Sequence, residues 1–350
     1  GAANPAFSIT YSGFVNSETA GVIDTSPTAT CSAIAGDNAG GVFPIVPAGG
    51  VDNNYNFVYV NGSLSITKAP LTARADDKSR SYGLANPGFT ISYTGFVNGD
   101  TESEIATPIA STVATSLSNV GAYPITLSGG SSINYNLTLQ NGVLTINVSP
   151  LIARASDNTK TYGQPNPTFS IVYSGFLNGD NASSITPPSI STTATITSSV
   201  GTYPITLSGG SALNYGIILQ PGTLTISKAS LTATANNQSR VYAASNPALT
   251  ISYTGFVNGE TSAVIDSAPI INTTATVLSP VGTYPISVTG GSDNNYNLVY
   301  ISGTLSITKA TLTATGVNAS RLYGALNPGF TINYTGFLNG DDLSTIDIVP

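Results

Sequence analysis

The sequence predicts an all-β protein: a tandem array of immunoglobulin-like antiparallel β-sandwich domains that together form an elongated rod. Three observations predict it. The same landmarks recur about every 80 residues along the 350-residue chain. Apolar and polar residues alternate with the two-residue period of a half-buried strand, and no segment has helical periodicity. The 36 glycines and 21 prolines supply the turns that many short strands need.

The repeat is defined by an Asn-Pro pair that recurs at intervals of 82, 80, 80 and 81 residues. The pair begins at Asn4, Asn86, Asn166, Asn246 and Asn327. A Gly-Phe pair starts nine positions after each of these Asn residues. The landmarks divide the chain into a partial repeat that lacks its first strand, three complete repeats, and the N-terminal half of a fifth. The expected boundaries are 1–69, 70–149, 150–229, 230–310 and 311–350, so we expect a section of a longer array.

In the second repeat, the alternation predicts a strand in each of six segments. In chain order they are 71–75, 89–94, 109–115, 123–127, 136–139 and 143–146. Turns are predicted at Asn98-Gly99-Asp100, at Gly129-Gly130 and at Asn141-Gly142, the last expected to close a β-hairpin. The closing strand of one repeat runs into the opening strand of the next without a Gly/Ser spacer, so we expect a semi-rigid array.

The charge composition excludes two classes of partner. Ten Lys and Arg stand against 17 Asp and Glu, a net charge of −7, and only 8% of the residues are charged. Such a chain has little with which to neutralise phosphates, so we expect no nucleic-acid binding. No apolar run approaches the 18 or more residues that span a bilayer, so we expect no direct membrane insertion.

The missing residue types argue against catalysis. The chain has no His, Met or Trp, and Cys31 is its single cysteine. Without imidazole or paired thiols, most catalytic triads and most zinc sites have no ligands to use. The acids lie in predicted turns and recur only loosely from repeat to repeat, which does not indicate a pair of carboxylates that converge in a cleft. We therefore expect no enzyme and no catalytic residue.

One run of the second repeat is similar to the MBG-type bacterial repeat domain. It is Tyr82-Gly-x-x-Asn86-Pro-x-Phe89-Thr-Ile-x-Tyr93-x-Gly95-Phe96-x-Asn98-Gly-Asp100, closed by Leu-Thr-Ile at 144–146. All five repeats carry the central part of this motif. The resemblance implies a large secreted or surface-attached bacterial protein, including adhesins, in which such repeats serve as stalk or fibre segments. It therefore implies an extracellular or cell-surface location, and it brings no catalytic residues.

Departures from the motif are few. The first repeat has Asn16-Ser17-Glu18 in place of Asn-Gly-Asp, and the fourth has Ala243 in place of the Gly that follows Tyr. The second repeat has Val148 where the first, third and fourth have Lys68, Lys228 and Lys309. We expect these lysines to be solvated residues at the repeat boundary, with a covalent bond to Asn or Asp as the alternative.

Acidic residues are the candidates for metal binding. Ca²⁺ takes six to eight oxygen ligands, and Asp76, Asp77, Asp100 and Asp180 could supply some of them. Ordinary turns require the same residue types. The fourth repeat has Asn236 and Asn237 where the second has Asp76 and Asp77, so it lacks the charge at these positions. We expect turn residues and no cofactor, with structural Ca²⁺ as the alternative.

Aromatic residues are the candidates for ligand binding. All 18 tyrosines fall at positions set by the repeat, which indicates core and hairpin packing. Tyr59 and Tyr300 occupy equivalent positions in the first and fourth repeats, and they are the best candidates for a glycan or surface-ligand site.

The predicted function is that of a structural stalk or fibre segment that spaces or displays an adhesive module. The first alternative is an adhesin whose repeats bind glycans or surface ligands multivalently. The second is an extracellular filament that assembles by strand exchange between chains. The expected partners are the neighbouring repeats of the same chain, with other copies or surface glycans under the alternatives.

Overall fold

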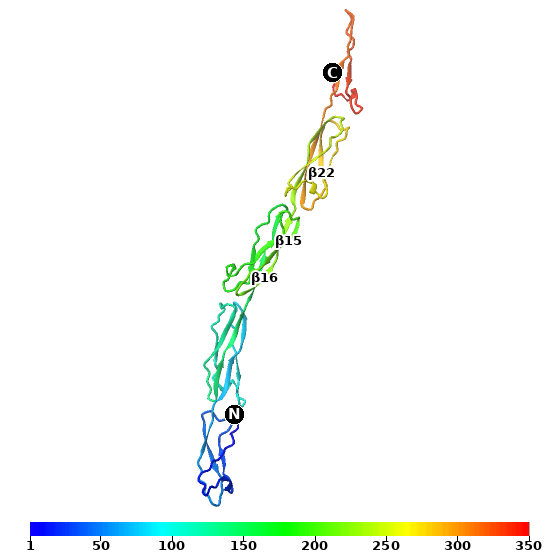
Figure 1. Cartoon of the computed structure of the whole chain (residues 1–350). Helices are drawn as coiled ribbons and strands as arrows, with labels where there is room; N and C mark the ends of the chain where they lie inside the picture. Colours follow the sequence, from blue (N-terminus) through cyan, green and yellow to red (C-terminus); the bar gives the residue numbers. More distant parts are fainter. Residues whose placement is uncertain (350) are drawn as a thin grey trace. The chain divides into compact units, whose positions relative to one another are not determined.

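The computed structural model describes residues 1–349. Within this range the regular structure consists of 26 β-strands and five three-residue 3₁₀ helices, and no α-helix occurs (Figure 1). The prediction of an all-β chain of repeated β domains is confirmed. No helix in residues 1–349 is long and apolar enough to cross a membrane.

The chain forms two compact units. The first comprises residues 1–152, 173–187 and 210–218. The second comprises residues 153–172 and 188–209 and the chain from Leu219 onward. The division passes through the third repeat, so each unit contains junctions between repeats that can be described by themselves. The predicted repeat boundaries stay predictions, and we use the repeat numbers as names.

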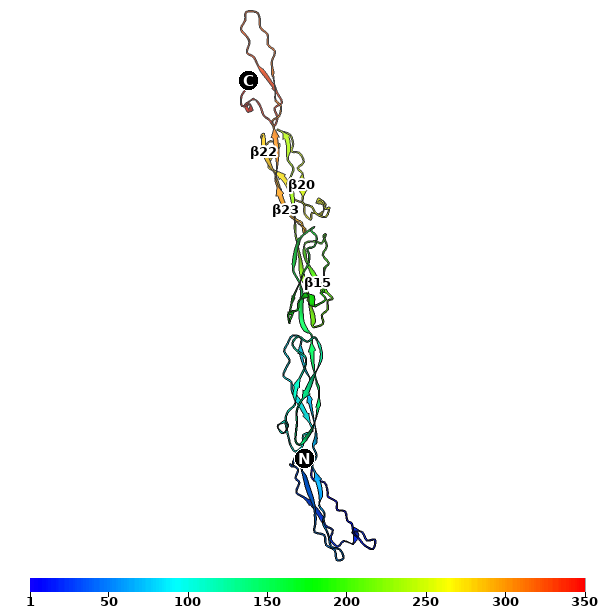
Figure 2. The ribbon, with the colours of Figure 1, turned by 90° about the vertical axis from the view of Figure 1, so that its left-hand side faces the viewer.

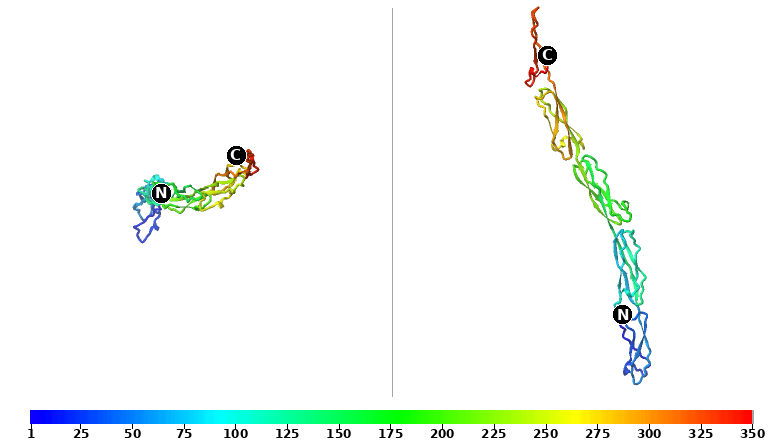
Figure 3. Two further views of the ribbon diagram at one scale, coloured as in Figure 1. Left: turned by 90° about the horizontal axis from the view of Figure 1, so that it is seen from above. Right: turned by 180° about the vertical axis from the view of Figure 1, so that it is seen from behind.

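The second repeat lies entirely in the first unit and consists of two sheets. The three-stranded sheet has the order β6 (Ile91–Thr94), β4 (Ala69–Ala75), β9 (Tyr135–Gln140). The four-stranded sheet has the order β5 (Lys78–Ser81), β10 (Gly142–Asn147), β8 (Gly121–Ser128), β7 (Ile109–Ser111). The right-hand view of Figure 3 shows these strands, in cyan, running along the length of the repeat.

The third and fourth repeats have the same strand order. In the third repeat, the three-stranded sheet has the order β13 (Ile171–Ser174), β11 (Ser149–Ala155), β16 (Tyr215–Gln220). Its four-stranded sheet has the order β12 (Asn158–Thr161), β17 (Gly222–Ser227), β15 (Gly201–Ser208), β14 (Ser189–Thr192). In the fourth repeat, the three-stranded sheet has the order β20 (Ile251–Thr254), β18 (Ala229–Ala235), β23 (Tyr296–Ile301). Its four-stranded sheet has the order β19 (Gln238–Val241), β24 (Gly303–Thr308), β22 (Gly282–Thr289), β21 (Ile270–Thr273). Figure 2 labels strands of both sheets of the fourth repeat.

The first and fifth repeats are simpler. The first has one sheet, β1 (Thr28–Cys31), β2 (Val42–Ala48), β3 (Gly62–Ser65), and the fifth pairs β25 (Thr313–Gly316) with β26 (Ile332–Thr335). The 3₁₀ helices are Ala20–Val22, Glu102–Glu104, Ala182–Ser184, Ser262–Val264 and Leu343–Thr345.

The core of the second repeat lies between its two sheets. Alternate residues of β4, Leu71, Ala73 and Ala75, are fully buried. Ala73 and Ala75 pack in one cluster with Ile125 of β8 and Leu144 of β10. The predicted alternation is therefore the alternation of core and surface. Alanine at the inward positions of β4 keeps the two sheets close.

The strands are not all antiparallel, and this part of the prediction is wrong. In the second repeat β4 pairs parallel with β9, and β5 pairs parallel with β10. The predicted hairpin at Asn141-Gly142 is also wrong, because β9 and β10 lie in different sheets with Asn141 alone between them. The chain changes sheet there instead of turning back.

A glycine makes this change of sheet possible. A Cβ added to Gly142 would lie 2.3 Å from the carbonyl oxygen of Ala75, at the end of β4. The counterparts Gly222 and Gly303 approach Ala155 and Ala235 in the same way, at 2.5 and 2.4 Å. The backbones of the two crossing segments therefore meet where no side chain fits.

In residues 1–69, the segments 9–12 and 55–60, which align with β6 and β9, do not form strands. The sheet of β1, β2 and β3 is present.

Gly142→Ala is expected to destabilise the second repeat by about 1–3 kcal/mol, because the new methyl group overpacks against the Ala75 carbonyl. Urea unfolding of the whole chain, with hydrogen exchange to localise the loss, measures the effect. Gly88→Ala is the matched control, because nothing lies within 4 Å of its added Cβ. Equal stability of the two variants would contradict the packing argument.

Candidate functional site

The strongest recurring arrangement of polar and aromatic side chains lies where one repeat meets the next. The strands on the two sides are almost continuous: only Val148 separates β10 from β11, and only Lys228 separates β17 from β18. The prediction of junctions without a spacer is confirmed at these two places. Each junction lies within one compact unit.

At the second junction, a tyrosine of the second repeat reaches the third. Tyr82 directly follows β5, is 4% exposed, and packs edge-on against the ring of Tyr215 with 5.5 Å between ring centroids. Its hydroxyl donates to Oδ2 of Asp180 at 3.0 Å. The hydroxyl of Tyr215 donates to the same oxygen at 2.7 Å. One carboxylate of the third repeat therefore binds a tyrosine from each side of the junction.

The third junction repeats this arrangement with a glutamate. The ring centroids of Tyr162 and Tyr296 lie 5.6 Å apart. Tyr162 donates to Oε1 of Glu260 at 2.6 Å, and Tyr296 donates to Oε2 at 2.5 Å. We call each such set, Tyr82–Asp180–Tyr215 and Tyr162–Glu260–Tyr296, a tyrosine–carboxylate junction.

The first junction has half of the arrangement. Tyr135 donates to Asp100 at 2.6 Å, within the second repeat. The first repeat has no counterpart of Tyr82. Asp100 and Asp180, two of the calcium candidates, are therefore hydrogen-bond acceptors at successive junctions.

The Asn-Gly-Asp turn contributes a second contact. Asn98 and Asn178 both have φ in the left-handed region, at +58° and +56°, which asparagine tolerates better than most residues. This conformation directs each side-chain amide to a backbone carbonyl of the preceding repeat, Ala35 at 3.0 Å and Ser116 at 3.1 Å. The motif predicted as a turn is a turn that also binds the neighbouring repeat.

The Asn of each Asn-Tyr pair contributes a third contact. The side-chain oxygens of these residues accept from backbone amides of the preceding repeat at 2.9 to 3.0 Å. The pairs are Asn134 with Ala39, Asn214 with Val120 and Asn295 with Val200.

The boundary lysines also bind across junctions. Lys68 and Lys228 donate to the backbone carbonyls of Ser132 and Asp293 in the following repeat, each at 2.7 Å. Their partners are backbone oxygens, and a covalent bond to Asn or Asp would need a side-chain partner.

A buried cation explains the Asn of Asn-Pro, and sequence reasoning missed it. Arg80 is buried in the second repeat without a carboxylate partner. Its Nε donates to Oδ1 of Asn86 at 2.8 Å, and its Nη atoms donate to the carbonyls of Ser81 and Thr115. The amide of Asn86 donates in turn to the Ala114 carbonyl at 2.7 Å. The sequence does contain a signal for this buried cation, because Arg80, Lys160 and Arg240 each stand two positions before a repeat tyrosine.

The third repeat has lysine at this position. Lys160 donates to the carbonyls of Gln164 and Thr195, but it does not reach the Asn of its own repeat. Oδ1 of Asn166 is consequently buried without a hydrogen-bond partner. Burial lowers the pKa of Lys160 below its usual value. The planar guanidinium of Arg80 donates to three acceptors, whereas the ammonium of Lys160 donates to two. The acceptor left without a donor is Oδ1 of Asn166.

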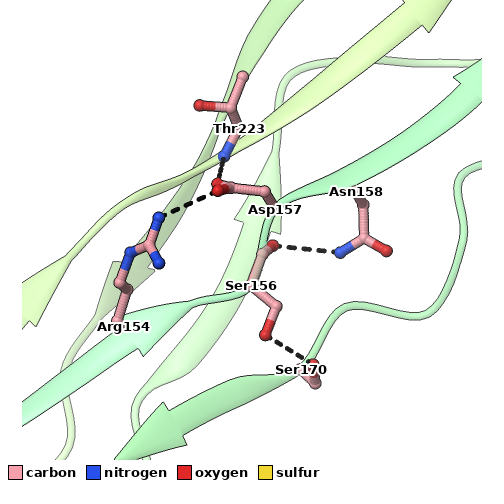
Figure 4. A network of polar contacts seen from close by, with 6 residues as sticks. All are labelled: Arg154, Ser156, Asp157, Asn158, Ser170 and Thr223. Atoms are coloured by element: carbon pink, nitrogen blue, oxygen red, sulfur yellow. Dashed lines mark hydrogen bonds and ion pairs between the residues drawn. The ribbon is translucent and has the colours of Figure 1, made fainter.

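Asp76 and Asp77 occur where the chain of the second repeat changes sheet. Asp76 accepts from the hydroxyls of Thr90 and Ser92, and these bonds lower its pKa. The Arg74 guanidinium, 2.9 Å from Asp77, lowers the pKa of that carboxyl, and the Val143 amide adds to the effect. The two carboxyl groups bind different partners. Figure 4 shows the equivalent network of the third repeat around Asp157.

No group of three or more His, Cys, Asp or Glu that could hold a metal ion occurs in residues 1–349. The structure brings Asp180 together with two tyrosines, and it does not bring the four calcium candidates together. A structural Ca²⁺ site stays a prediction.

Tyr59 and Tyr300 are partly exposed, at 40% and 39%. Tyr300 lies in β23, and Tyr59 lies in the segment 55–60, which is not a strand. The hydroxyl of Tyr59 accepts from the Gly50 amide at 2.8 Å, and that of Tyr300 donates to the Gly290 carbonyl. Each ring therefore lies over the Gly-Gly turn of its own repeat. A ligand site on their exposed faces stays a prediction.

One pocket, of about 320 Å³, lies at the fourth junction. Tyr242, Leu312, Phe337 and Asp341 are among its lining residues. In the fourth repeat, Tyr242 occupies the position of Tyr82 and Tyr162.

The comparison with protein families agrees with this repeat organisation. The sequence profile described as MBG domain (YGX type) matches the chain five times, over residues 1–65, 71–145, 151–225, 231–306 and 311–349. No curated protein matches the chain. Among solved structures, Drosophila N-cadherin EC1-3 is similar at 8% identity over 55% of this chain and 78% of that chain, with a TM-score of 0.17.

Lys160→Arg is expected to stabilise the third repeat by about 1 kcal/mol, because Nε of the arginine supplies the donor that Asn166 lacks. Hydrogen exchange of the amides of β12 and β17 in the whole chain measures the change. The reverse substitution in the second repeat, Arg80→Lys, is the matched partner and should destabilise by a similar amount. If neither substitution changes the stability, the assigned role of the buried cation is wrong.

Stability is expected to fall in alkaline solution between about pH 10 and pH 12. Burial, reinforced by hydrogen bonds to Asp180 and Glu260, raises the pKa of Tyr215 and Tyr296 from 10.0 to about 12. Between these pH values the folded chain retains protons that the unfolded chain loses. The contribution of the two tyrosines to the free energy of unfolding is therefore complete below about pH 10 and is lost as the pH rises through about 12. Unfolding at several pH values, with phenolate absorbance recorded in parallel, measures it. Ionisation of these two tyrosines near pH 10 without loss of stability would contradict the assignment.

Proposed function

The chain belongs to the MBG domain family of the YGX type, and on this premise we propose that it is a stalk or fibre segment of an extracellular bacterial surface protein. The resemblance read from the motif that begins at Tyr82 is confirmed by the family match. MBG repeats are structural or adhesion-type domains typical of extracellular proteins. The proposed task is to hold a distal module at a distance.

The tyrosine–carboxylate junction is the observation that carries the proposal. A spacer needs repeats whose relative orientation is restrained, and a free linker would not restrain it. Across a linker of one residue, Tyr82 packs against the ring of Tyr215 and donates one hydrogen bond to Asp180. Tyr215 binds the same carboxylate from within the third repeat. Hydrogen bonds to an ionised acceptor are stronger than neutral ones, which favours one arrangement of the two repeats.

The acids singled out by the sequence support a structural role. Asp76, Asp77, Asp100 and Asp180 accept hydrogen bonds from neighbouring hydroxyl, guanidinium or amide groups of the chain. A general acid or a metal ligand needs an oxygen directed at a substrate or an ion. We therefore assign the chain no reaction and no cofactor.

Multivalent binding is the second candidate function, and the half-exposed rings of Tyr59 and Tyr300 favour it. Exposed tyrosines are suited to contacts with glycans or protein surfaces. Their occurrence in only the first and fourth repeats limits the number of such sites, since Leu139 and Leu219 occupy the position in the second and third. Filament assembly by strand exchange stays a further prediction.

The spacer function is tested by a distance measurement across the second junction. In a Cys31→Ser background, spin labels are placed at Val113→Cys in the second repeat and Leu213→Cys in the third, both at exposed positions of the first unit. Double electron–electron resonance on the whole chain is expected to give one narrow distance distribution. The pair Tyr82→Ala and Asp180→Ala should broaden it.

Asp100→Ala is the matched control, because it removes the corresponding carboxylate from the first junction and leaves the second intact. It should not change the distance distribution between the two labels. A distribution that is already broad in the parent chain would refute the spacer proposal.

A further inference from the structure

We propose that each complete repeat also has a mechanical function: it resists tension through a parallel ladder that is loaded in shear. The ladder is formed by the segment through which the chain reaches the repeat and the segment through which it leaves. This inference deepens the proposed spacer function and rests on it, because a spacer on a surface transmits the force that acts on its distal module.

In the second repeat we define the leading segment as residues 69–81, β4 and β5, and the closing segment as residues 135–147, β9 and β10. The two segments lie side by side through both sheets. In the three-stranded sheet they pair in parallel from Ala69 with Tyr135 to Arg74 with Gln140. In the four-stranded sheet they pair in parallel from Lys78 with Leu144 to Ser81 with Asn147. One parallel ladder thus extends along the repeat, interrupted only at the change of sheet.

The direction of loading follows from this register. The chain reaches the repeat at Ala69, at one end of the ladder, and leaves it at Asn147, at the other end. Tension on the chain therefore pulls the two segments past each other along their own axes. In this geometry the hydrogen bonds of the ladder share the load at the same time. A ladder pulled apart from one end breaks its bonds one after another.

The fourth repeat has the same ladder. Its leading and closing segments pair in parallel from Ala229 with Tyr296 to Thr234 with Ile301, and again from Gln238 with Leu305 to Val241 with Thr308. In the third repeat, β12 and β17 pair in parallel from Asn158 with Leu224 to Thr161 with Ser227. The feature therefore belongs to the repeat and not to one copy of it.

The change of sheet would be the weak point of the ladder, and a side chain bridges it. Oδ1 of Asp77, on the leading segment, accepts from the backbone amide of Val143 on the closing segment at 2.8 Å. Asp157 accepts from the Thr223 amide at the same distance, as Figure 4 shows. In the fourth repeat the oxygen of Asn237 accepts from the Thr304 amide, also at 2.8 Å. An acceptor oxygen is present in all three repeats, and a charge is not.

The load then passes to the next repeat through the shortest connection. The closing segment of the second repeat ends at Asn147, and the leading segment of the third begins at Ser149. Because one residue lies between the two ladders, little slack can be drawn out before the next ladder carries the force.

The test is single-molecule force spectroscopy on the whole chain in two attachment geometries. Attached at its two ends, the chain is expected to show three strong unfolding events, one for each complete repeat. Each event should release about 80 residues, about 270 Å of extended chain less the folded length.

In the second geometry, a Cys31→Ser chain is attached through Ala122→Cys and Thr145→Cys. These exposed residues lie opposite each other near the end of the antiparallel ladder where β8 begins and β10 ends, so the force opens that ladder from its end. Unfolding of the second repeat is expected at a force about twofold lower than in the end-to-end geometry, because its bonds then break in succession. Equal forces in the two geometries would overturn the inference.

Variants of the bridge add a second readout in the end-to-end geometry. Asp77→Ala should lower the force of one of the three events, whereas Asp77→Asn should not, because Asn237 performs the same task in the fourth repeat. Arg74→Ala is the control that removes the ion pair and leaves the Val143 bond. If Asp77→Ala unfolds the second repeat at rest, two events remain and the comparison of geometries still decides.

The two proposals fail in different ways. A broad distance distribution at the junction with high unfolding forces would refute the spacer function and leave the mechanical ladder. A narrow distribution with equal forces in the two geometries would refute only the ladder.

Discussion

The parallel pairing of the leading and closing segments is the constraint on which the rest of the structure depends. Because both segments change sheet at the same place, their backbones must approach closely, and glycine at position 142 permits this. The same crossing requires an acceptor near the Val143 amide, which Asp77 supplies.

The junctions follow from the same pairing. In a parallel ladder the last residues of both segments lie at the same end, so Tyr82, directly after β5, emerges beside Asn147 at the end of β10. It is therefore already at the boundary where the third repeat begins, and its ring meets Tyr215 there. The tyrosine of the Tyr-Gly motif is a junction residue because the strand before it runs parallel to the strand that leaves the repeat.

Alternation and recurrence allowed the β class, the strand segments and the absence of spacers to be predicted from the sequence. The direction of pairing could not be predicted, because a short strand alternates in the same way in a parallel and in an antiparallel ladder. Asn141-Gly142 has the composition of a hairpin turn, and only its contact with Ala75 shows that the chain changes sheet. The sequence indicates Asp180 as a turn residue and a calcium candidate, but its tyrosine partners come from two repeats, and one sequence does not show which residues meet.

The distribution of charge explains how so few ionised groups support this arrangement. In residues 1–349 the ion pairs are Arg74–Asp77 and Arg154–Asp157, and both are about half exposed, where such pairs contribute little. The buried Arg80 is bound by carbonyl and amide oxygens, and Asp180 is bound by hydroxyl groups. The parallel ladder and the junction therefore depend on directed hydrogen bonds at short range, which salt screens far less than it screens exposed ion pairs. The geometry of both is expected to change little with ionic strength.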